Sequence, residues 1–271
     1  MEIERILDHF IRAGHEMKTC QWVGWTENDD QLTPGVVATL IMRWWCRHRI
    51  DRFDAWLAKT QGGKDLVEPI KTGVHAIVSS AVGLPAKPKP EDQLQAFVAE
   101  HIWFFLSVAT ETEEDVVRIE GPSLDVTDPG GDGMVIHDQA APDSWQFRLW
   151  EIKKHTGGAH VSSTLRKAYQ QLDRRGIQYL NKYSLIGEYL DDPQLARFYA
   201  LLPDYWIERS HFAAAGVAVA VNTPLPVRSF QGFVRLFPEF ADPPRLRGLL
   251  AAFDDFPKFA RDVRRDLWSG L

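Results

Sequence analysis

The stretch Gly131-Asp132-Gly133-Met134-Val135-Ile136, followed by Glu151-Ile152-Lys153, decides how this chain is interpreted. An aspartate precedes one short apolar run, and a glutamate and a lysine close the next. Residues i and i+2 of a β-strand point to the same face, so Glu151 and Lys153 are expected to share a mostly apolar strand face. Opposite charges on a buried strand are costly unless they are paired or bound to a metal ion. The two stretches therefore predict a site.

The composition is that of an ordinary soluble globular protein. The chain has 271 residues, of which 45% are hydrophobic and 25% are charged, enough for one large domain or two small ones. No apolar run approaches the roughly 18 residues of a membrane span, and the acidic start Met1-Glu2-Ile3-Glu4-Arg5 is unlike a signal peptide. Cys20 and Cys46 are too few for a disulfide framework or a cysteine-based zinc site. We therefore expect a cytoplasmic protein that does not associate with membranes.

The charge is unevenly distributed along the chain. Eight basic and two acidic side chains fall between residues 148 and 182, so this stretch carries +6, while the whole chain carries −6 and the remainder −12. So acidic a protein is not expected to coat nucleic acid indiscriminately, but the basic stretch is compatible with contact to a phosphate backbone at one place. Helix surfaces are often rich in Lys and Arg without binding a ligand, so the patch by itself identifies no partner.

Residues 1–84 are predicted to be mainly helical. Apolar residues recur at helical spacing from Ile3 to Ile11, and further helices are expected over 34–57 and 63–82. The proline-rich segment 84–90 interrupts this pattern and is the best candidate for a domain boundary. We interpret 1–84 as a helical N-terminal region with a regulatory or partner-binding role.

Residues 91–222 are predicted to form an α/β core around a small mixed sheet. The expected order is helix, strand, strand, strand, helix, strand, over residues 91–108, 116–120, 134–137, 146–154, 162–176 and 216–221. The remaining residues, 223–271, are expected to add a helical extension packed on this core, with an amphipathic helix over 244–267. The predicted fold class is therefore α/β (α+β), with helices flanking a central mixed sheet.

Asp132, Glu151 and Lys153 have the chemistry that phosphodiester hydrolysis needs. Such hydrolysis requires hard oxygen ligands for Mg²⁺, a means of activating water and a cation near the phosphate. The carboxylates of Asp132 and Glu151, on adjacent strands, can hold the metal ion, and the backbone carbonyl of Ile152 can add a ligand. Lys153 shares the face of Glu151, so its ammonium group can position or deprotonate the water, or stabilise the charge that develops on the phosphate.

These three residues, in this order of helices and strands, resemble the catalytic core of the PD-(D/E)xK nuclease superfamily, which includes many restriction enzymes and DNA-repair nucleases. The resemblance covers residues 91–222 and implies a restriction-endonuclease-like core in which Asp132, Glu151 and Lys153 are catalytic. It also implies a Mg²⁺ cofactor, for which Mn²⁺ can substitute.

Two further positions match features that many members of the superfamily share. One is a carboxylate on the helix that precedes the sheet, and Glu100 is the matching residue. The other is a glutamine on the helix that follows the Glu-x-Lys strand, and Gln170 or Gln171 matches it. The resemblance therefore implies four metal ligands: Asp132, Glu151, Ile152 and Glu100. Glu100 is also expected to be catalytic.

The chain departs from the family pattern at two positions. Gly131 precedes Asp132 where many members have a proline, and the tyrosine that a RecB-like subset carries four residues after its glutamine is Arg175 here. The resemblance is therefore to the superfamily and not to that subset. Asp125 and Asp128 are alternatives to Asp132 as the metal ligand if the strand begins earlier than predicted.

Three other patterns have simpler interpretations. The motif Glu16-Met17-Lys18 has the Glu-x-Lys spacing but is predicted to lie on an N-terminal helix, so the spacing alone has no value. A Gly-Asp-Gly sequence by itself is most often a turn. His155 and His160 are expected in a surface loop, because no third or fourth zinc ligand lies near them in the sequence.

The favoured function is a Mg²⁺-dependent nuclease that hydrolyses DNA. The sequence contains no helix-turn-helix, zinc finger or separate reading domain, so we expect cleavage without sequence specificity. Contacts to the phosphate backbone are predicted for the basic and glutamine side chains that follow the Glu-x-Lys strand: Lys154, Arg166, Lys167, Gln171, Arg174 and Arg175.

Partner control is expected because small bacterial nucleases of this superfamily commonly act as effectors of anti-phage systems, where a helicase or another defence protein restrains or delivers them. The nuclease subunit of Hachiman-type systems is one such case and is similar in size. This expectation rests on analogy with the family. Two alternatives stay open: a catalytically silent interaction protein that keeps the nuclease fold, and a nuclease that cleaves RNA by the same chemistry.

Overall fold

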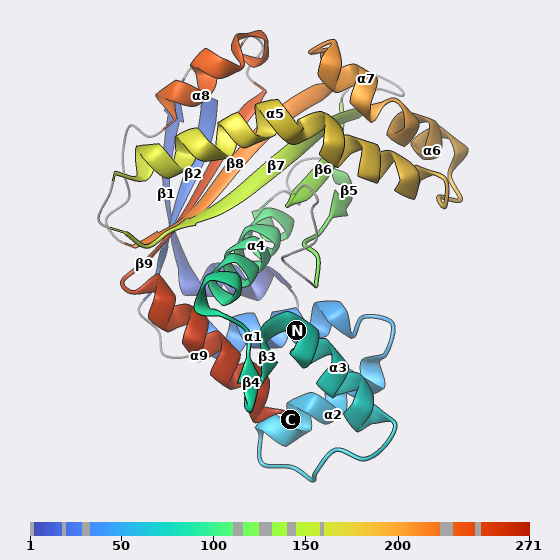
Figure 1. Ribbon diagram of the computed structural model, residues 1–271, viewed down its shortest axis with the longest axis vertical. Helices are drawn as coiled ribbons and strands as arrows, with labels where there is room; N and C mark the ends of the chain where they lie inside the picture. Colours follow the sequence, from blue (N-terminus) through green and yellow to red (C-terminus); the bar gives the residue numbers. More distant parts are fainter. Residues whose placement is uncertain are drawn as a thin grey trace.

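The computed structural model describes residues 3–17, 20–28, 33–110, 116–124, 132–139, 145–157, 160–222, 230–241 and 245–271. Gly131 and the two alternative ligands, Asp125 and Asp128, lie outside these residues. The described residues form a seven-stranded mixed sheet with helices on both faces (Figure 1), together with a small two-stranded hairpin. The α/β class is therefore confirmed. Within the described residues, no helix combines the length and the apolar character that crossing a bilayer requires.

Parallel strands occupy the centre of the large sheet, whose order is β1-β2-β9-β8-β7-β6-β5. The strands β7 (Trp145–His155), β8 (Ala213–Asn222) and β9 (Leu246–Phe253) run parallel to one another. On one side, β6 (Gly133–Asp138) and β5 (Val116–Glu120) complete an antiparallel meander with β7. Central parallel strands are covered on both faces, which explains why β8 is an almost uninterrupted run of Ala and Val.

The start of the chain is not the helix that the apolar spacing predicts. A short 3₁₀-helix, η1 (Ile3–His9), leads into the antiparallel strands β1 (Phe10–Met17) and β2 (Cys20–Glu27), and β2 pairs in parallel with β9. The prediction of helix is therefore wrong for residues 10–27. Trp22, Val23 and Trp25 are strand-favouring residues, and pairing with the centre of the sheet outweighs the weak helical periodicity before them.

Three helices follow, as predicted in outline but with different limits. The single helix expected over 34–57 is two helices, α1 (Thr33–Trp45) and α2 (Ile50–Thr60), separated by a turn in which the Arg49 amide donates to the Cys46 carbonyl at 2.8 Å. The helix α3 (Ile70–Val82) begins after Pro69 and not at residue 63. The predicted proline-rich break is the small hairpin of β3 (Gly83–Leu84) and β4 (Lys87–Pro88).

The C-terminal region contains a central strand and is not the all-helical extension expected. The helix predicted over 244–267 divides into β9 and α9 (Phe256–Ser269), after the short α8 (Gln231–Leu236) and η3 (Pro238–Phe240). Apolar runs as short as that of β9 fit a buried strand as well as a buried helix. Asp255 marks the change, because its side chain accepts a hydrogen bond from the Lys258 amide at 2.9 Å and caps α9. All three predicted regions thus contribute strands to one sheet.

The two faces of the sheet carry separate hydrophobic clusters. One face is covered by α4 (Glu91–Thr110) and α9, with α1, α2 and α3 beyond them. The other is covered by α5 (Val161–Gly187), α6 (Pro193–Ala200), α7 (Leu202–Ile207) and α8. The predicted order helix, strand, strand, strand, helix, strand is present as α4, β5, β6, β7, α5 and β8, with α6 and α7 inserted before β8.

Two tryptophans pack α4 against the strands that carry the predicted catalytic residues. Trp103 of α4 and Trp150 of β7 lie with their ring centroids 5.6 Å apart. Each ring lies over a glycine: a Cβ on Gly133 would approach Trp103 Cη2 to 2.1 Å, and one on Gly216 would approach Trp150 Cδ2 to 2.3 Å. The glycine after Asp132 is therefore required by close packing. This packing places the turn of α4 that contains Glu100 against β6 and β7.

Candidate active site

The site lies where β7 extends beyond β6. The strand β7 has 11 residues and β6 has 6, and their pairing ends with Gly133 opposite Trp150. Asp132, immediately before β6, continues the contact with its side chain: Oδ2 accepts a hydrogen bond from the Ile152 amide at 2.6 Å. The side chain thereby satisfies an amide that the shorter strand leaves unpaired, and it holds the Asp132 carboxylate next to Glu151.

Glu151 and Lys153 lie beyond the last pair of β6 and β7, on one face of β7, and they form an ion pair. The Lys153 ammonium donates a hydrogen bond to Glu151 Oε1. The Glu151 side chain is fully buried, whereas that of Lys153 is 29% exposed. Glu151 Oε2 is buried and has no hydrogen-bond partner among the described residues. A buried carboxylate oxygen without a partner is costly, and such a group in a native structure points to a missing ligand.

Glu100 belongs to the same cluster although it comes from the helix on the other side of the sheet. It is 9% exposed, and burial raises its pKa well above the ordinary value. The charges of Asp132 and Glu151 raise that pKa further, and the charge of Lys153 lowers it. The four residues predicted to be catalytic therefore lie close enough to influence one another electrostatically.

Burial also raises the pKa of both strand carboxyls. The pKa of Glu151 rises to about 8 because of burial and then the charge of Asp132, against the opposing effect of Lys153. Burial raises the pKa of Asp132, while Lys153 and the Ile152 amide lower it. The raised pKa of Glu151 means that, near neutral pH, protons compete with a bound cation for its carboxylate.

The pKa of Lys153 is also raised, but for a different reason. Burial is the largest single influence and lowers its pKa, but Glu151 and Asp132 together raise that pKa above the ordinary value for lysine. The side chain is therefore an ammonium ion at neutral pH. A protonated lysine cannot abstract a proton from water, so of the roles predicted for Lys153 the geometry favours stabilisation of negative charge.

The donor chemistry of the cluster fits a hard divalent cation, because Glu100, Asp132 and Glu151 offer carboxylate oxygens and one of these has no partner. Among the described residues, however, no three His, Cys, Asp or Glu side chains already converge in an arrangement that could hold a metal ion. Two of the three carboxylates have partners within the protein: Asp132 Oδ2 accepts from the Ile152 amide and Glu151 Oε1 from Lys153. The part predicted for the Ile152 carbonyl stays a prediction.

The neighbouring Lys154 lies on the opposite face of β7 and has other partners. Its ammonium group donates to Asp92 Oδ1 at 2.6 Å and to Gln95 Oε1 at 2.9 Å, both on α4. It therefore joins the strand to the helix that carries Glu100. The structure separates Lys154 from the other residues predicted to contact phosphate.

Those other residues lie on α5. Arg166, Lys167, Arg174 and Arg175 are exposed, and the charge of Arg175 reaches the site, where it lowers the pKa of Glu151. Gln171 is half-buried, and its Nε2 donates to the hydroxyl oxygen of Tyr179 at 2.8 Å. The sequence reasoning overlooked Tyr179. Its spacing of four residues from Arg175 and eight from Gln171, on one helix face, was the available signal.

The competing patterns are also resolved in part. Glu16 and Met17 lie on strand β1 and not on the predicted helix, while Lys18 lies outside the described residues. His155 is the last residue of β7, and its Nδ1 lies 2.8 Å from the Thr164 hydroxyl of α5. His160 is the residue that precedes α5. His155 thus links the strand to the helix in place of the predicted surface loop.

Comparison with known proteins does not assign the chain to a family. Neither a protein-family model nor a curated protein sequence matches it. The interpretation of the site therefore rests on its own residues, their burial and their contacts.

Proposed function

We propose that this protein is a metal-dependent nuclease that hydrolyses phosphodiester bonds in DNA, with a core like that of the PD-(D/E)xK nucleases. One observation carries the proposal: a fully buried Glu151, paired with Lys153 and flanked by Asp132 and Glu100, has a carboxylate oxygen without a partner. Such a cluster is unfavourable for the stability of the protein alone, and a function in binding a cation and a phosphate accounts for it.

The order and direction of the elements support the same proposal. The resemblance implies the order helix, strand, strand, strand, helix, strand, and α4, β5, β6, β7, α5 and β8 follow this order. In the structure β5, β6 and β7 are antiparallel neighbours and β8 is parallel to β7. The acidic residues lie at the end of the sheet where β6 begins and where the second half of β7 runs beyond it. The carboxyl ends of parallel strands are a common place for ligand binding in α/β proteins.

The metal ion would be held by Asp132, Glu151 and Glu100, with the Ile152 carbonyl as a further ligand. Mg²⁺, or Mn²⁺ in its place, supplies positive charge that polarises the phosphate and makes a nearby water more acidic. In the hydrolysis, the water oxygen bonds to phosphorus, the bond from phosphorus to a sugar oxygen breaks, and the proton lost from the water is balanced by one taken up at that oxygen. Lys153 keeps its own proton and donates hydrogen bonds to phosphate oxygens as their charge increases.

The exposed basic residues of α5 would bind the backbone of the nucleic acid. Arg166, Lys167, Arg174 and Arg175 neutralise phosphates without reading bases, so binding is expected to weaken steeply with salt and to differ little between sequences. Lys154 is assigned a structural role in this proposal because Asp92 and Gln95 occupy it. The proposal of a helicase or other defence protein as a partner rests on the family analogy alone.

The proposal is tested by substituting the pair on β7. The wild type, Glu151→Gln and Lys153→Met are incubated with supercoiled, linear and single-stranded DNA and with RNA, in Mg²⁺ or Mn²⁺. We expect the wild type to cleave DNA and each variant to be slower by at least about 100-fold, the usual effect of removing one charge-stabilising group. Lys258→Met is a matched control because it removes an equally ion-paired but exposed lysine from α9.

The outcomes separate the alternatives. Cleavage that survives Glu151→Gln and Lys153→Met would show that the site is elsewhere. Cleavage of RNA alone would favour the ribonuclease alternative. A wild type that cleaves none of the substrates would contradict the proposal for the isolated chain and favour the interaction protein.

A further inference from the structure

One face of α5 points three polar side chains toward the β7 site. Gln171, Arg175 and Tyr179 follow one another at intervals of four residues, so they line a single face of the helix. Two of them act on the site directly: the charge of Arg175 lowers the pKa of Glu151, and Tyr179 influences the pKa of Lys153. This face therefore borders the carboxylate cluster from the side of the sheet opposite α4.

Tyr179 is the most constrained of the three. It is 4% exposed, and its hydroxyl oxygen accepts a hydrogen bond from Gln171 Nε2 at 2.8 Å. Arg175, between them on the same helix face, lowers the pKa of this hydroxyl. Because Gln171 donates to the phenol oxygen, the hydrogen of the phenol is left to donate to another group. No acceptor for that hydrogen is found among the described residues.

The surroundings keep that hydrogen in place. Burial raises the pKa of Tyr179, and the charges of Glu151 and Asp132 raise it further, while the donors Gln171 and Arg175 lower it without reversing the shift. The pKa of the phenol therefore lies above its ordinary value of 10, and the hydroxyl keeps its hydrogen near neutral pH. A neutral hydroxyl beside a cationic lysine and a cluster of carboxyls is suited to an anionic oxygen that arrives with a substrate.

We propose that Tyr179 donates a hydrogen bond to a non-bridging oxygen of the phosphate that is cleaved. This inference rests on the proposed nuclease function and adds a substrate contact to it. Gln171 holds the phenol oxygen by its hydrogen bond, so in this proposal it is a positioning residue and not the direct phosphate contact that the sequence predicted. The contact forms no covalent bond; it stabilises negative charge on the phosphate, together with Lys153 on the other side.

A purely structural role is the competing explanation, because Tyr179 is also part of the hydrophobic cluster beneath α5. Tyr179→Phe separates the two explanations, since it keeps the ring and removes only the hydroxyl. Tyr169→Phe is the matched control: Tyr169 lies on the same helix, is buried, and stacks on Phe233 of α8 at 5.7 Å. Melting temperatures of both variants verify that the fold is kept.

The experiment measures cleavage at one chosen linkage of an oligonucleotide duplex, identified by the length of the product. Either non-bridging oxygen of that linkage is replaced in turn by sulfur. We expect Tyr179→Phe to lower kcat by about 10- to 100-fold with little change in KM, and Tyr169→Phe to match the wild type. Sulfur is a weak acceptor, so in one of the two stereoisomers it should slow the wild type and should not slow Tyr179→Phe further. Gln171→Leu should have a smaller effect than Tyr179→Phe and add nothing to it.

Two results would overturn the inference. A Tyr179→Phe variant with the wild-type kcat, or one in which the sulfur effect and the substitution multiply in both stereoisomers, would show that the hydroxyl does not contact the phosphate. Glu151→Gln is assayed beside them: if it is inactive while Tyr179→Phe is unaffected, the nuclease function stands and only the tyrosine contact is wrong. A wild type without any cleavage would overturn both.

Discussion

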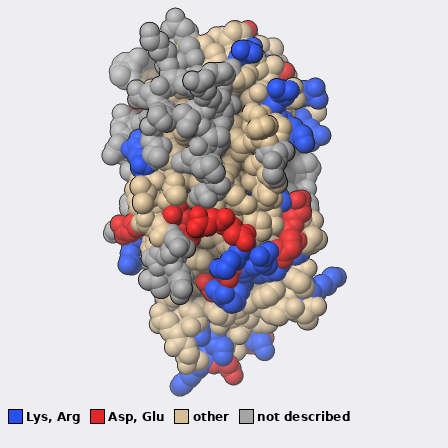
Figure 2. Space-filling model, turned by 90° about the vertical axis from the view of Figure 1, so that its left-hand side faces the viewer, with Lys and Arg blue, Asp and Glu red and all other residues tan. Residues whose placement is uncertain are grey.

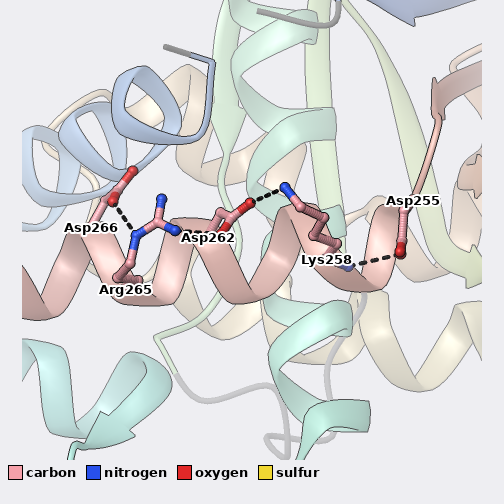
Figure 3. Close-up of polar contacts among 5 residues, drawn as sticks. All are labelled: Asp255, Lys258, Asp262, Arg265 and Asp266. Atoms are coloured by element: carbon pink, nitrogen blue, oxygen red, sulfur yellow. Dashed lines mark hydrogen bonds and ion pairs between the residues drawn. The ribbon is translucent and has the colours of Figure 1, made fainter. Parts of the chain in front are cut away.

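Two regions of this protein contain nearly the same charged residues, and they differ in what surrounds them. The helix α9 presents Asp255, Lys258, Asp262, Arg265 and Asp266 along its exposed side, and Figure 3 shows them in a chain of contacts. The site on β7 combines Glu100, Asp132, Glu151 and Lys153 in the interior. Carboxylate–cation pairs occur in both, so the residue types do not separate a surface from a site. The two regions are separated by the burial of their charged side chains and by whether each polar atom has a hydrogen-bond partner.

On α9 each of these side chains has a polar partner, and the basic ones are largely exposed. Lys258 Nζ lies 2.8 Å from Asp262 Oδ2, and Arg265 Nη1 lies 2.7 Å from Asp262 Oδ1. The Lys258 and Arg265 side chains are 67% and 66% exposed. On the side of the molecule where α9 lies, Figure 2 shows in its lower half a row of acidic side chains directly beside a cluster of basic ones. Solvent screens such pairs, so this surface stabilises the fold only weakly and gives no sign of a ligand.

On β7 the same kind of pair has almost no solvent to screen it. Glu151 is fully buried with one oxygen unpartnered, and two further carboxyls lie near it with a single lysine. Interactions between charges are several times stronger in such surroundings than at the surface, in both directions. The comparison teaches that a Glu-x-Lys sequence becomes informative only when the strand that carries it is buried.

The largest difference between the two regions is expected when the lysine is removed. Lys153→Met leaves buried carboxyls without their cation and should lower the free energy of unfolding by about 3 kcal/mol at pH 9, where Glu151 is ionised. At pH 6 the loss should be smaller, because Glu151, whose pKa is about 8, then carries a proton. Lys258→Met should change the melting temperature by no more than about 2 °C at either pH. Urea unfolding and thermal melting measure both; equal effects for the two lysines would contradict the comparison.

Binding of a divalent cation should stabilise the β7 site and leave the α9 surface unaffected. If Mg²⁺ or Mn²⁺ binds the β7 cluster, the melting temperature of the wild type should rise with cation concentration, by the equivalent of about 2.7 kcal/mol at a hundredfold excess over Kd. The rise should be larger at pH 8.5 than at pH 6, because protons compete for Glu151 below its pKa of about 8.

The control for that experiment comes from both regions. Glu151→Gln should lose most of the cation-dependent rise, whereas Asp262→Asn on α9 should keep it. A rise that is the same in all three proteins would show that the cation binds elsewhere or acts only through ionic strength.

Glu151→Gln should also change how stability depends on pH in the absence of metal. In the folded protein the pKa of Glu151 is raised from 4.5 to about 8, so its stabilising contribution is complete below pH 4.5 and is lost as pH rises through 8. Glutamine does not titrate and loses nothing. The variant should therefore gain stability relative to the wild type across this range, by about 4 to 5 kcal/mol at pH 8.5. A constant difference from pH 5 to pH 8.5 would show that Glu151 is ionised throughout.

The sequence was sufficient to predict the segment from α4 to β8 in outline because local and long-range preferences agree there. Apolar alternation marks β5, β6 and β7, and strand geometry alone puts Glu151 and Lys153 on one face. Glu100 was reached through the family resemblance, and its closeness to Asp132 depends on Trp103 packing over Gly133. Such packing leaves no signature in the periodicity of either segment.

Elsewhere the sequence misled because tertiary pairing outweighed local pattern. The segments of β1, β2 and β9 have apolar patterns that predict a helix or fit a helix and a strand equally well. They form strands because they extend an existing sheet. The partners of Lys154 on α4, 59 and 62 residues away, could not be inferred from strand alternation, which shows only that it faces away from Lys153. The role of Tyr179 depends on a contact with Gln171 two helical turns earlier, and the spacing of the two residues was available but unused.

The smallest expected effect is a difference in how the stability of the two regions depends on salt concentration. The exposed pairs of α9 are screened within about 10 Å at 0.1 M salt, so the difference in melting temperature between the wild type and Asp262→Asn should fall toward zero as NaCl increases to 0.5 M. The difference between the wild type and Lys153→Met should persist, because counterions do not reach a fully buried Glu151. Melting curves at several salt concentrations, without divalent cations, measure both. If salt removed both differences alike, the β7 carboxylates would be solvated in solution, and the argument that their burial implies a ligand would fail.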